Sequence, residues 1–190
     1  MARQYHAPRG AQNDMSTDTN KRATPKWLIN WLTEGWGAHI WLDACATAEN
    51  AVVPLFIGPP DGLRVSWAKV AGEEDAFPRR GDLWVWMNPP YGRGMIKKWV
   101  EKARMEWEDN GIKTLALLPA DLSTGWAKLL VGPHGLLRFN TFLFNGRLRF
   151  EGQKTGAMFA SMLVEIGPKN TAGLATVMVV DSRQLEKEWG

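Results

Sequence analysis

The sequence has few of the residues that cross-link a chain, bind metals or span membranes. Its single cysteine, Cys45, excludes an intramolecular disulfide framework and favours a reducing compartment. One cysteine and three scattered histidines show no spacing typical of a metal site, so no metal is expected. No apolar run approaches the length of a membrane span, and the polar N-terminus lacks the apolar segment of a signal peptide. These absences favour a globular protein of the cytoplasm with no membrane partner.

The charge is nearly balanced, whereas one aromatic residue type is abundant. The 190 residues include 23 basic and 20 acidic ones, and the net charge of +3 excludes a histone-like polycation but leaves nucleic acid open. Tryptophan occurs 11 times and tyrosine only twice. Tryptophan serves cores, interfaces and base stacking alike, so the count alone selects no function. Most of the tryptophans fall on apolar positions of expected helices and strands, which favours core or cofactor-wall roles.

The hydrophobic pattern predicts one α/β domain over residues 23–190, preceded by a polar arm over residues 1–22. The arm is either flexible or an extended lead-in. Short apolar runs predict four strands, at residues 39–43, 52–57, 83–87 and 114–118. An amphipathic helix is expected over residues 95–107, closed by Asn110-Gly111. This strand–helix–strand succession predicts parallel strands.

Three further segments complete the expected architecture. Thr24 is expected to be the N-cap of an earlier helix, with Pro25 at the first helical position. The charged segment 68–82 resembles a loop. The apolar stretches 159–166 and 174–180 predict an antiparallel pair at a sheet edge.

The most informative motif is Asn88-Pro89-Pro90-Tyr91, which follows an apolar strand directly. Open α/β sheets bind ligands at the carboxyl ends of their strands. The tetrapeptide resembles the motif of amino-group methyltransferases that use S-adenosylmethionine, which implies an exocyclic amine, such as that of a purine, as the methyl acceptor. Such an amine is a poor nucleophile, and the Asn88 side-chain oxygen with the Pro89 carbonyl could accept its two hydrogens and steer its lone pair. Pro89 and Pro90 would stiffen the loop, and Tyr91 could stack on the base. The alternative is a plain strand-ending turn, because Asn and Pro are common turn residues.

A second candidate site is the turn Asp43-Ala44-Cys45-Ala46 after the strand 39–43. Its small residues would let the backbone approach a cofactor, and the Asp43 carboxylate could meet the positive end of a bound methionine moiety. The alternative for Asp43 is a helix N-cap. No histidine lies at a position that suggests it activates Cys45 as a nucleophile. Cys45 is therefore expected to be a small packed residue of this turn.

Several blocks together resemble the phage-type DNA N6-adenine methyltransferase (Dam) family over residues 23–166. The blocks that carry the resemblance are Thr24-Pro25, residues 43–50, Asp61-Gly62-Leu63 with Trp67, residues 86–93, residues 98–103, Leu118-Pro119-Ala120 with Trp126, and residues 146–150. After Phe150 the chain departs from the proline-containing stretch that is usual in that family, which leaves the role of residues 151–158 open.

The resemblance implies a Rossmann-like methyltransferase fold with a mostly parallel sheet, an antiparallel edge hairpin and helices on both faces. It also implies S-adenosylmethionine as methyl donor, adenine in double-stranded DNA as acceptor, and a bacterial or phage-infected host cell. Asn88, Pro89, Pro90 and Tyr91 would form the catalytic set. The residues expected at the cofactor are Thr24, Pro25, Asp43, Cys45, Asn50, Asp61 and Asn88.

Such an enzyme must flip its target base out of the duplex, which requires cations near the DNA backbone. Residues 122–150 contain basic residues and no acidic one. Arg147 and Arg149 alternate with apolar residues and should share one face. The residues expected at DNA are Arg93, Lys97, Lys128, Arg138, Arg147 and Arg149. Only residues 121–158 could form a target-recognition region, so a short or loosely defined recognition sequence is expected.

Two other classes of function remain compatible with the sequence. The first is a non-catalytic module on a methyltransferase fold that binds DNA or blocks restriction by occupancy. The intact Asn88-Pro89-Pro90-Tyr91 motif argues against it, because a dead site has no need to keep every member. The second is an N-methyltransferase that acts on RNA or on protein glutamine.

Overall fold

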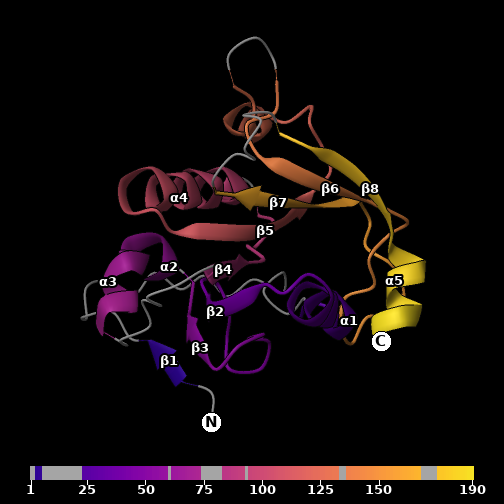
Figure 1. The fold of residues 1–190 in the computed structure, drawn as a ribbon, viewed down its shortest axis with the longest axis horizontal. Helices are drawn as coiled ribbons and strands as arrows, with labels where there is room; N and C mark the ends of the chain where they lie inside the picture. Colours follow the sequence, from indigo (N-terminus) through magenta and orange to yellow (C-terminus); the bar gives the residue numbers. More distant parts are fainter. Residues whose placement is uncertain are drawn as a thin grey trace.

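A single mixed sheet organises the computed structural model, which describes residues 3–5, 23–59, 61–73, 83–92, 94–132, 136–167 and 175–190. The strands are β1 (Arg3–Tyr5), β2 (His39–Asp43), β3 (Leu55–Ile57), β4 (Leu83–Met87), β5 (Lys113–Pro119), β6 (Asn140–Asn145), β7 (Ser161–Ile166) and β8 (Val177–Asp181). Their order is β1-β3-β2-β4-β5-β7-β6-β8, which Figure 1 shows from bottom to top. Within these residues every strand pair is parallel except β5–β7 and β6–β7. The expected mostly parallel sheet is therefore confirmed.

Helices cover both faces of the sheet. They are α1 (Lys26–Asn30), the π-helix η2 (Trp31–Gly35), α2 (Asp61–Arg64), α3 (Trp67–Glu73), α4 (Met95–Asn110), the 3₁₀-helix η3 (Gly125–Leu130) and α5 (Ser182–Trp189). Along β4, Trp84 and Trp86 pack with α1, η2 and α5, whereas Val85 and Met87 pack with α3, α4 and η3. Burial on both faces is what a parallel strand requires. The prediction of helices on both faces is confirmed.

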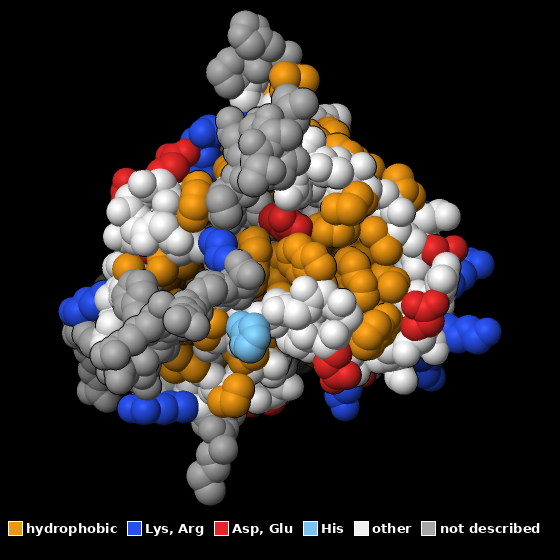
Figure 2. Space-filling model, viewed as in Figure 1, with side chains coloured by type: hydrophobic (Ala, Val, Ile, Leu, Met, Phe, Trp, Pro, Cys, Tyr) orange, Lys and Arg blue, Asp and Glu red, His pale blue; other side chains and the backbone are white. Residues whose placement is uncertain are grey.

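Much of the tryptophan excess lies in these two cores. Trp67, Trp86 and Trp99 are fully buried. Trp36 lies over the sheet, with its ring 5.8 Å from that of Trp84 and 5.7 Å from that of Phe142. Figure 2 shows hydrophobic side chains gathered over β6, β7 and β8. The tryptophans named here therefore pack the sheet, as expected from their apolar positions.

The prediction for the C-terminal strands was wrong in its pairing. The stretches 159–166 and 174–180 contain β7 and β8, but β6 lies between them. Strand β8 pairs with β6 in parallel, and β7 is an interior strand antiparallel to both of its neighbours. Strand β6 was missed because it is bounded by polar asparagines, and its burial comes from partners far along the chain.

Several element boundaries also differ from the expected ones. Helix α3 occupies the start of the segment 68–82 that resembled a loop, because Trp67, Val70 and Ala71 bury one face of a turn and a half. The residues 74–82 lie outside the described ones. Strand β3 has three residues instead of the expected 52–57, and α4 extends to Asn110 before Gly111, whose φ of 70° suits glycine. Within the polar arm, residues 3–5 form β1, as an extended lead-in would.

The strand directions collect the loops of interest at one edge of the sheet. Strands β2, β4 and β5 are parallel, so Asp43, Met87 and Pro119 end at the same edge. Strand β7 is antiparallel to β5 and to β6, so β6 also ends at this edge and β7 begins there. The segments that follow β2, β4 and β6 therefore lie along one edge of the sheet, which we call the carboxyl edge.

Candidate active site

The motif Asn88-Pro89-Pro90-Tyr91 lies at the carboxyl edge, directly after β4. Pro89 and Pro90 are buried and have no N–H to extend the ladder, which ends the strand. The half-buried Asn88 side chain is oriented from both ends. Its Nδ2 donates to Thr24 Oγ1 at 3.3 Å, and its Oδ1 accepts from the Tyr91 hydroxyl at 3.0 Å. The amide oxygen therefore has a defined direction at the end of the central strand.

Thr24 reaches Asn88 because it does not cap the helix after it. Helix α1 begins at Lys26 behind Pro25, whose ψ of 133° is extended, and no side chain of the N-cap closes the turn. The Thr24 N-cap prediction was wrong, since the Lys26 N–H donates instead to Glu151 Oε1 at 3.1 Å. Ala23 is bridged to Glu151 as well. Thr24 is 6% exposed, so its hydroxyl meets the Asn88 amide away from bulk water.

The Tyr91 hydroxyl has two acceptors within reach. One is Asn88 Oδ1 at 3.0 Å and the other is the Leu117 carbonyl at 3.3 Å. A phenol carries one hydrogen, so it can donate fully to only one of them at a time. The Tyr91 ring packs edge-on against Phe159, with centroids 5.1 Å apart at 77°. Sequence reasoning missed Phe159, because no local pattern distinguishes it.

The Asp43 carboxylate lies at the end of β2 and is 3% exposed. Its Oδ1 accepts from Cys45 N at 3.3 Å, and its Oδ2 accepts from Val52 N at 3.2 Å. Burial raises the pKa of Asp43 to about 7, although both backbone hydrogen bonds lower it. Among the described residues no salt bridge neutralises this carboxylate. The site thus contains a buried acid that a cation could ionise.

The turn after Asp43 packs tightly against its surroundings. Ala44 N donates to the Trp86 carbonyl at 3.0 Å, and a Cβ at Gly62 would collide with the Ala44 carbonyl oxygen. The Cys45 thiol is buried and hydrogen-bonded by the Asn88 backbone. Burial, followed by the charge of Asp43, raises the pKa of Cys45 well above its ordinary value. A neutral, buried thiol agrees with a packed residue, and it joins this turn to the loop after β4.

Asn50 and Asp61, which were expected at the cofactor, lie on the β2–β3 side of the carboxyl edge. Asn50 Oδ1 accepts from Thr47 N at 2.7 Å and from Thr47 Oγ1 at 3.2 Å, which closes the turn after β2. Asp61 begins α2, and its partly exposed carboxylate lies 3.8 Å from Arg64. The structure therefore brings both residues to the side of Asp43.

Arg147 and Arg149 alternate with buried neighbours, as expected, but residues 146–150 follow β6 and form no strand, so the two arginines do not share a strand face. Both arginines are exposed, whereas Leu148 and Phe150 are buried. Arg147 Nη1 donates to the Met158 carbonyl at 2.6 Å and to the preceding carbonyl at 3.1 Å. Arg147 thus holds the segment that precedes Phe159, whose ring packs against Tyr91. Its position in the sequence did not indicate this role.

The other expected DNA contacts are dispersed. Lys97 lies in the first turn of α4, a few residues after the Asn88-Pro89-Pro90-Tyr91 motif, and pairs with Glu101 at 3.6 Å. Lys128 is exposed on η3. Arg138 precedes β6, at the opposite edge of the sheet from Asn88, and lies 3.4 Å from Glu108. Arg93 lies outside the described residues. The structure therefore does not bring Arg138 to the candidate site.

Among the described residues no group of three His, Cys, Asp or Glu side chains could hold a metal ion. Over the same residues, no helix combines the length and apolar character needed to span a bilayer.

The amino-acid sequence matches a known protein family over most of its length. A family model described as DNA N-6-adenine-methyltransferase (Dam) matches residues 12–188. The chain belongs to this family. The resemblance seen in its sequence blocks is therefore confirmed, and the matched span includes Thr24, Asp43 and the whole Asn88-Pro89-Pro90-Tyr91 motif.

Two curated phage proteins are similar to this chain, and both are named DNA N-6-adenine-methyltransferase, which is a transferase. The protein of Escherichia phage T1 is 35% identical over 105 residues, which cover 55% of this chain and 37% of that protein. The protein of Haemophilus phage HP1 (strain HP1c1) is 26% identical over 145 residues, which cover 76% of this chain and 73% of that protein. The chain thus spans little more than a third of the phage T1 relative. No solved structure matches it.

Proposed function

We propose that this chain transfers a methyl group from S-adenosylmethionine to the N6 amino group of adenine in double-stranded DNA. The observation that carries the proposal is the Asn88 amide, held between Thr24 and Tyr91 at the end of a central parallel strand. In a member of the Dam family, an acceptor oriented in this way suits an adenine amine. Asn88 Oδ1 and the Pro89 carbonyl would accept its two hydrogens, so that the nitrogen lone pair is free to attack a methyl group.

The two acceptors of Tyr91 support this role for Asn88. When a base amine donates to Asn88 Oδ1, the Tyr91 hydroxyl can turn to the Leu117 carbonyl without losing its hydrogen bond. Tyr91 would then present its ring to the base while Phe159 holds it from the other side. This arrangement would let the site exchange an internal hydrogen bond for one to the substrate.

The strand order supports a Rossmann-like methyltransferase fold and a cofactor at its switch point. After β2 the chain goes to β3 on one side, and it then crosses to β4 on the other. The crevice between two such strands is where open α/β sheets bind ligands, and here Asp43 and Asn88 line it. The cofactor would supply an electrophilic methyl group on a sulfonium.

The chain's own residues fit such a cofactor in charge and position. The buried Asp43 carboxylate, with only backbone partners in the contacts described above, would bind the positively charged end of the methionine moiety. The turn with Cys45 would let the backbone approach. Thr24, Pro25, Asn50 and Asp61 would line the remaining wall.

The DNA would approach the carboxyl edge, where a flipped adenine can reach Asn88. Flipping costs a few kcal/mol and needs a hold on the backbone. We assign this to the exposed Lys97, Lys128 and Arg149 and to Arg93, which follows the Asn88-Pro89-Pro90-Tyr91 motif in the sequence, with residues 121–158 as the recognition region. Since these are few, a short or loose recognition sequence is expected. Methylation of host-cell or phage DNA would take place in the cytoplasm.

Mass spectrometry of nucleosides tests the reaction directly. DNA incubated with the protein and S-adenosylmethionine should yield N6-methyl-2′-deoxyadenosine. Asn88→Ala should lower the rate by about a hundredfold or more, as removal of a key hydrogen-bonding group does elsewhere, while cofactor binding is retained. RNA and protein substrates with labelled cofactor form the parallel arms. Labelling of either one instead of DNA, or normal methylation by Asn88→Ala, would overturn the proposal.

A further inference from the structure

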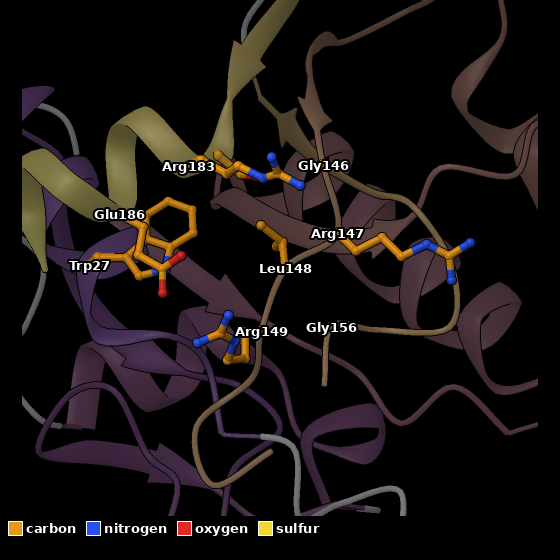
Figure 3. A pocket seen from close by; sticks show the side chains of 9 residues that line it. Trp27, Gly146, Arg147, Leu148, Arg149, Gly156, Arg183 and Glu186 are labelled. Carbon is orange, nitrogen blue, oxygen red and sulfur yellow. The ribbon is translucent and has the colours of Figure 1, made fainter. Parts of the chain in front are cut away.

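A pocket of about 460 Å³ lies at the segment that follows β6, and none of the proposed catalytic or cofactor-binding residues lines it. Figure 3 shows its walls, with Trp27 and Glu186 on one side and Arg147 on the other. The side chains that matter here are Trp27, Arg147, Leu148, Arg149, Arg183 and Glu186. Three arginines against one glutamate make its lining cationic. Trp27 and Leu148 are buried, so they give the pocket a packed apolar wall.

The pocket and the catalytic loop share their supporting residues. Trp27 lies three residues after Thr24, whose hydroxyl accepts a hydrogen bond from the Asn88 side chain. Glu151, two residues after Arg149, is bridged to Ala23. The pocket is therefore joined through short segments to the residue that orients the catalytic amide, and a ligand in it would lie at the same edge of the sheet.

Arg149 and Arg183 are available for a ligand, whereas Arg147 is already engaged. Arg147 donates to the Ala157 and Met158 carbonyls. Arg149 and Arg183 are exposed, and no salt bridge involves them among the described residues. The backbone N–H of Arg183 is capped by Asp181, so its guanidinium, and not the helix end, is the group offered to the pocket. Two arginines that line one pocket, one from the segment between β6 and β7 and one from α5, suit an oxyanion, which guanidinium groups bind through paired N–H donors.

We propose that this pocket binds a backbone phosphate of the target DNA through Arg149 and Arg183, with Arg147 as a positioning residue for the adjoining loop. The proposal rests on the proposed function, because it takes DNA as the substrate. Asn88 follows β4 and Gly146 follows β6, and β5 and β7 lie between them. Three strand spacings are about 14 Å, which is about four base steps along a duplex. The phosphate would therefore lie a few nucleotides from the flipped adenine.

The dependence of DNA affinity on salt measures this contact. Fluorescence anisotropy would follow binding of a short duplex that the wild-type protein methylates, with S-adenosylhomocysteine present, between about 50 and 200 mM salt. Arg149→Ala and Arg183→Ala should each lower the slope of log K against log salt by about one, and each should weaken binding by about tenfold. Glu186→Gln should strengthen binding, because it removes the one acid from the pocket lining.

Lys187→Ala is the matched control, since Lys187 is an exposed cation on the same helix and lies outside the pocket lining. It should keep the wild-type slope and affinity. Melting temperatures equal to that of the wild type would exclude misfolding of the variants. The stronger DNA binding expected of Glu186→Gln could not result from misfolding. If both arginine variants kept the wild-type slope of log K against log salt, and Glu186→Gln did not bind DNA more strongly, the phosphate site would be overturned. The proposed function would stand in that case, provided that the wild-type protein methylates DNA. Absence of DNA methylation by the wild type would instead overturn the proposed function.

Discussion

The hydroxyl of Thr24 lies 3.3 Å from the side-chain nitrogen of Asn88, a residue 64 positions later. The contact joins the segment before α1 to the loop after β4. It orients the Asn88 amide so that its oxygen, the proposed acceptor for the base amine, lies toward Tyr91. A residue outside the Asn88-Pro89-Pro90-Tyr91 motif therefore helps to set the geometry of the motif.

Thr24→Val removes this hydroxyl while keeping most of the side-chain volume. We expect the kcat of DNA methylation to fall about tenfold, since the amide loses one neutral hydrogen bond and with it part of its orientation. Thr24→Ser should retain most of the activity because it keeps the hydroxyl. Steady-state methylation kinetics with tritiated cofactor measure both, and an unchanged kcat for Thr24→Val would show that Thr24 does not orient Asn88.

Tyr91→Phe separates the ring of Tyr91 from its hydroxyl. The ring should stay packed against Phe159, whereas Asn88 Oδ1 and the Leu117 carbonyl lose a donor. We expect a severalfold loss of kcat and a larger loss for Tyr91→Ala, which also removes the stacking surface. Single-turnover kinetics measure the chemical step of both variants. Equal losses in the two would contradict a separate role for the ring.

The raised pKa of Asp43 predicts how the stability of the cofactor-free protein depends on pH. The pKa is about 7 in the folded protein against 3.8 for the ordinary group, so the folded state binds a proton that the unfolded chain releases. This contribution to stability is complete below about pH 4 and is lost as the pH rises to about 7. The free energy of unfolding of Asp43→Asn, compared with that of the wild type, should therefore increase as the pH rises over that range. Urea unfolding at several pH values measures the difference, and a constant difference would contradict a buried neutral Asp43.

The same group predicts the pH dependence of cofactor binding. If the ionised Asp43 carboxylate binds a cationic group of S-adenosylmethionine, affinity should rise by up to about tenfold per pH unit below pH 7 and level off above it. Asp43→Asn should bind more weakly and without this slope. Titration calorimetry at several pH values tests this, and parallel profiles for the two proteins would place the cation elsewhere.

Glu106 holds α3 to α4 from a position that is 2% exposed. Its Oε1 accepts from Trp67 N at 2.8 Å and from Lys102 Nζ at 2.6 Å, and its Oε2 accepts from Asn110 Nδ2 at 2.9 Å. Glu106→Ala should lower the free energy of unfolding by about 3 kcal/mol, because it leaves a nearly buried ammonium without its partner.

Glu108→Ala is the matched control on the same helix. The Glu108 side chain is 45% exposed in its pairs with Arg104 and Arg138, so its loss should cost less than about 1 kcal/mol. Denaturant unfolding followed by circular dichroism compares the two variants. Equal losses would show that burial does not set the value of the Glu106 contacts.

Local patterns in the sequence predicted the elements whose cause is local. Strand β4 coincides with its predicted limits, because an apolar run is followed by two prolines that cannot extend a ladder. The C-terminus of α4 lies at Asn110-Gly111 for a similar reason, since glycine adopts the left-handed conformation there. Asp43 and Asn88 were identified in the same way, as polar residues at the carboxyl ends of apolar strands.

The tertiary structure decided which distant residues meet. Four features have no local signature: the insertion of β6 between β7 and β8, the Thr24 bond to Asn88, the packing of Phe159 on Tyr91, and the pocket that Arg149 and Arg183 both line. Each depends on strand directions and on burial against partners many residues away, and these follow only from the whole fold. The sequence by itself determined which polar side chains lie at the carboxyl edge, and the fold determined the partners that orient them.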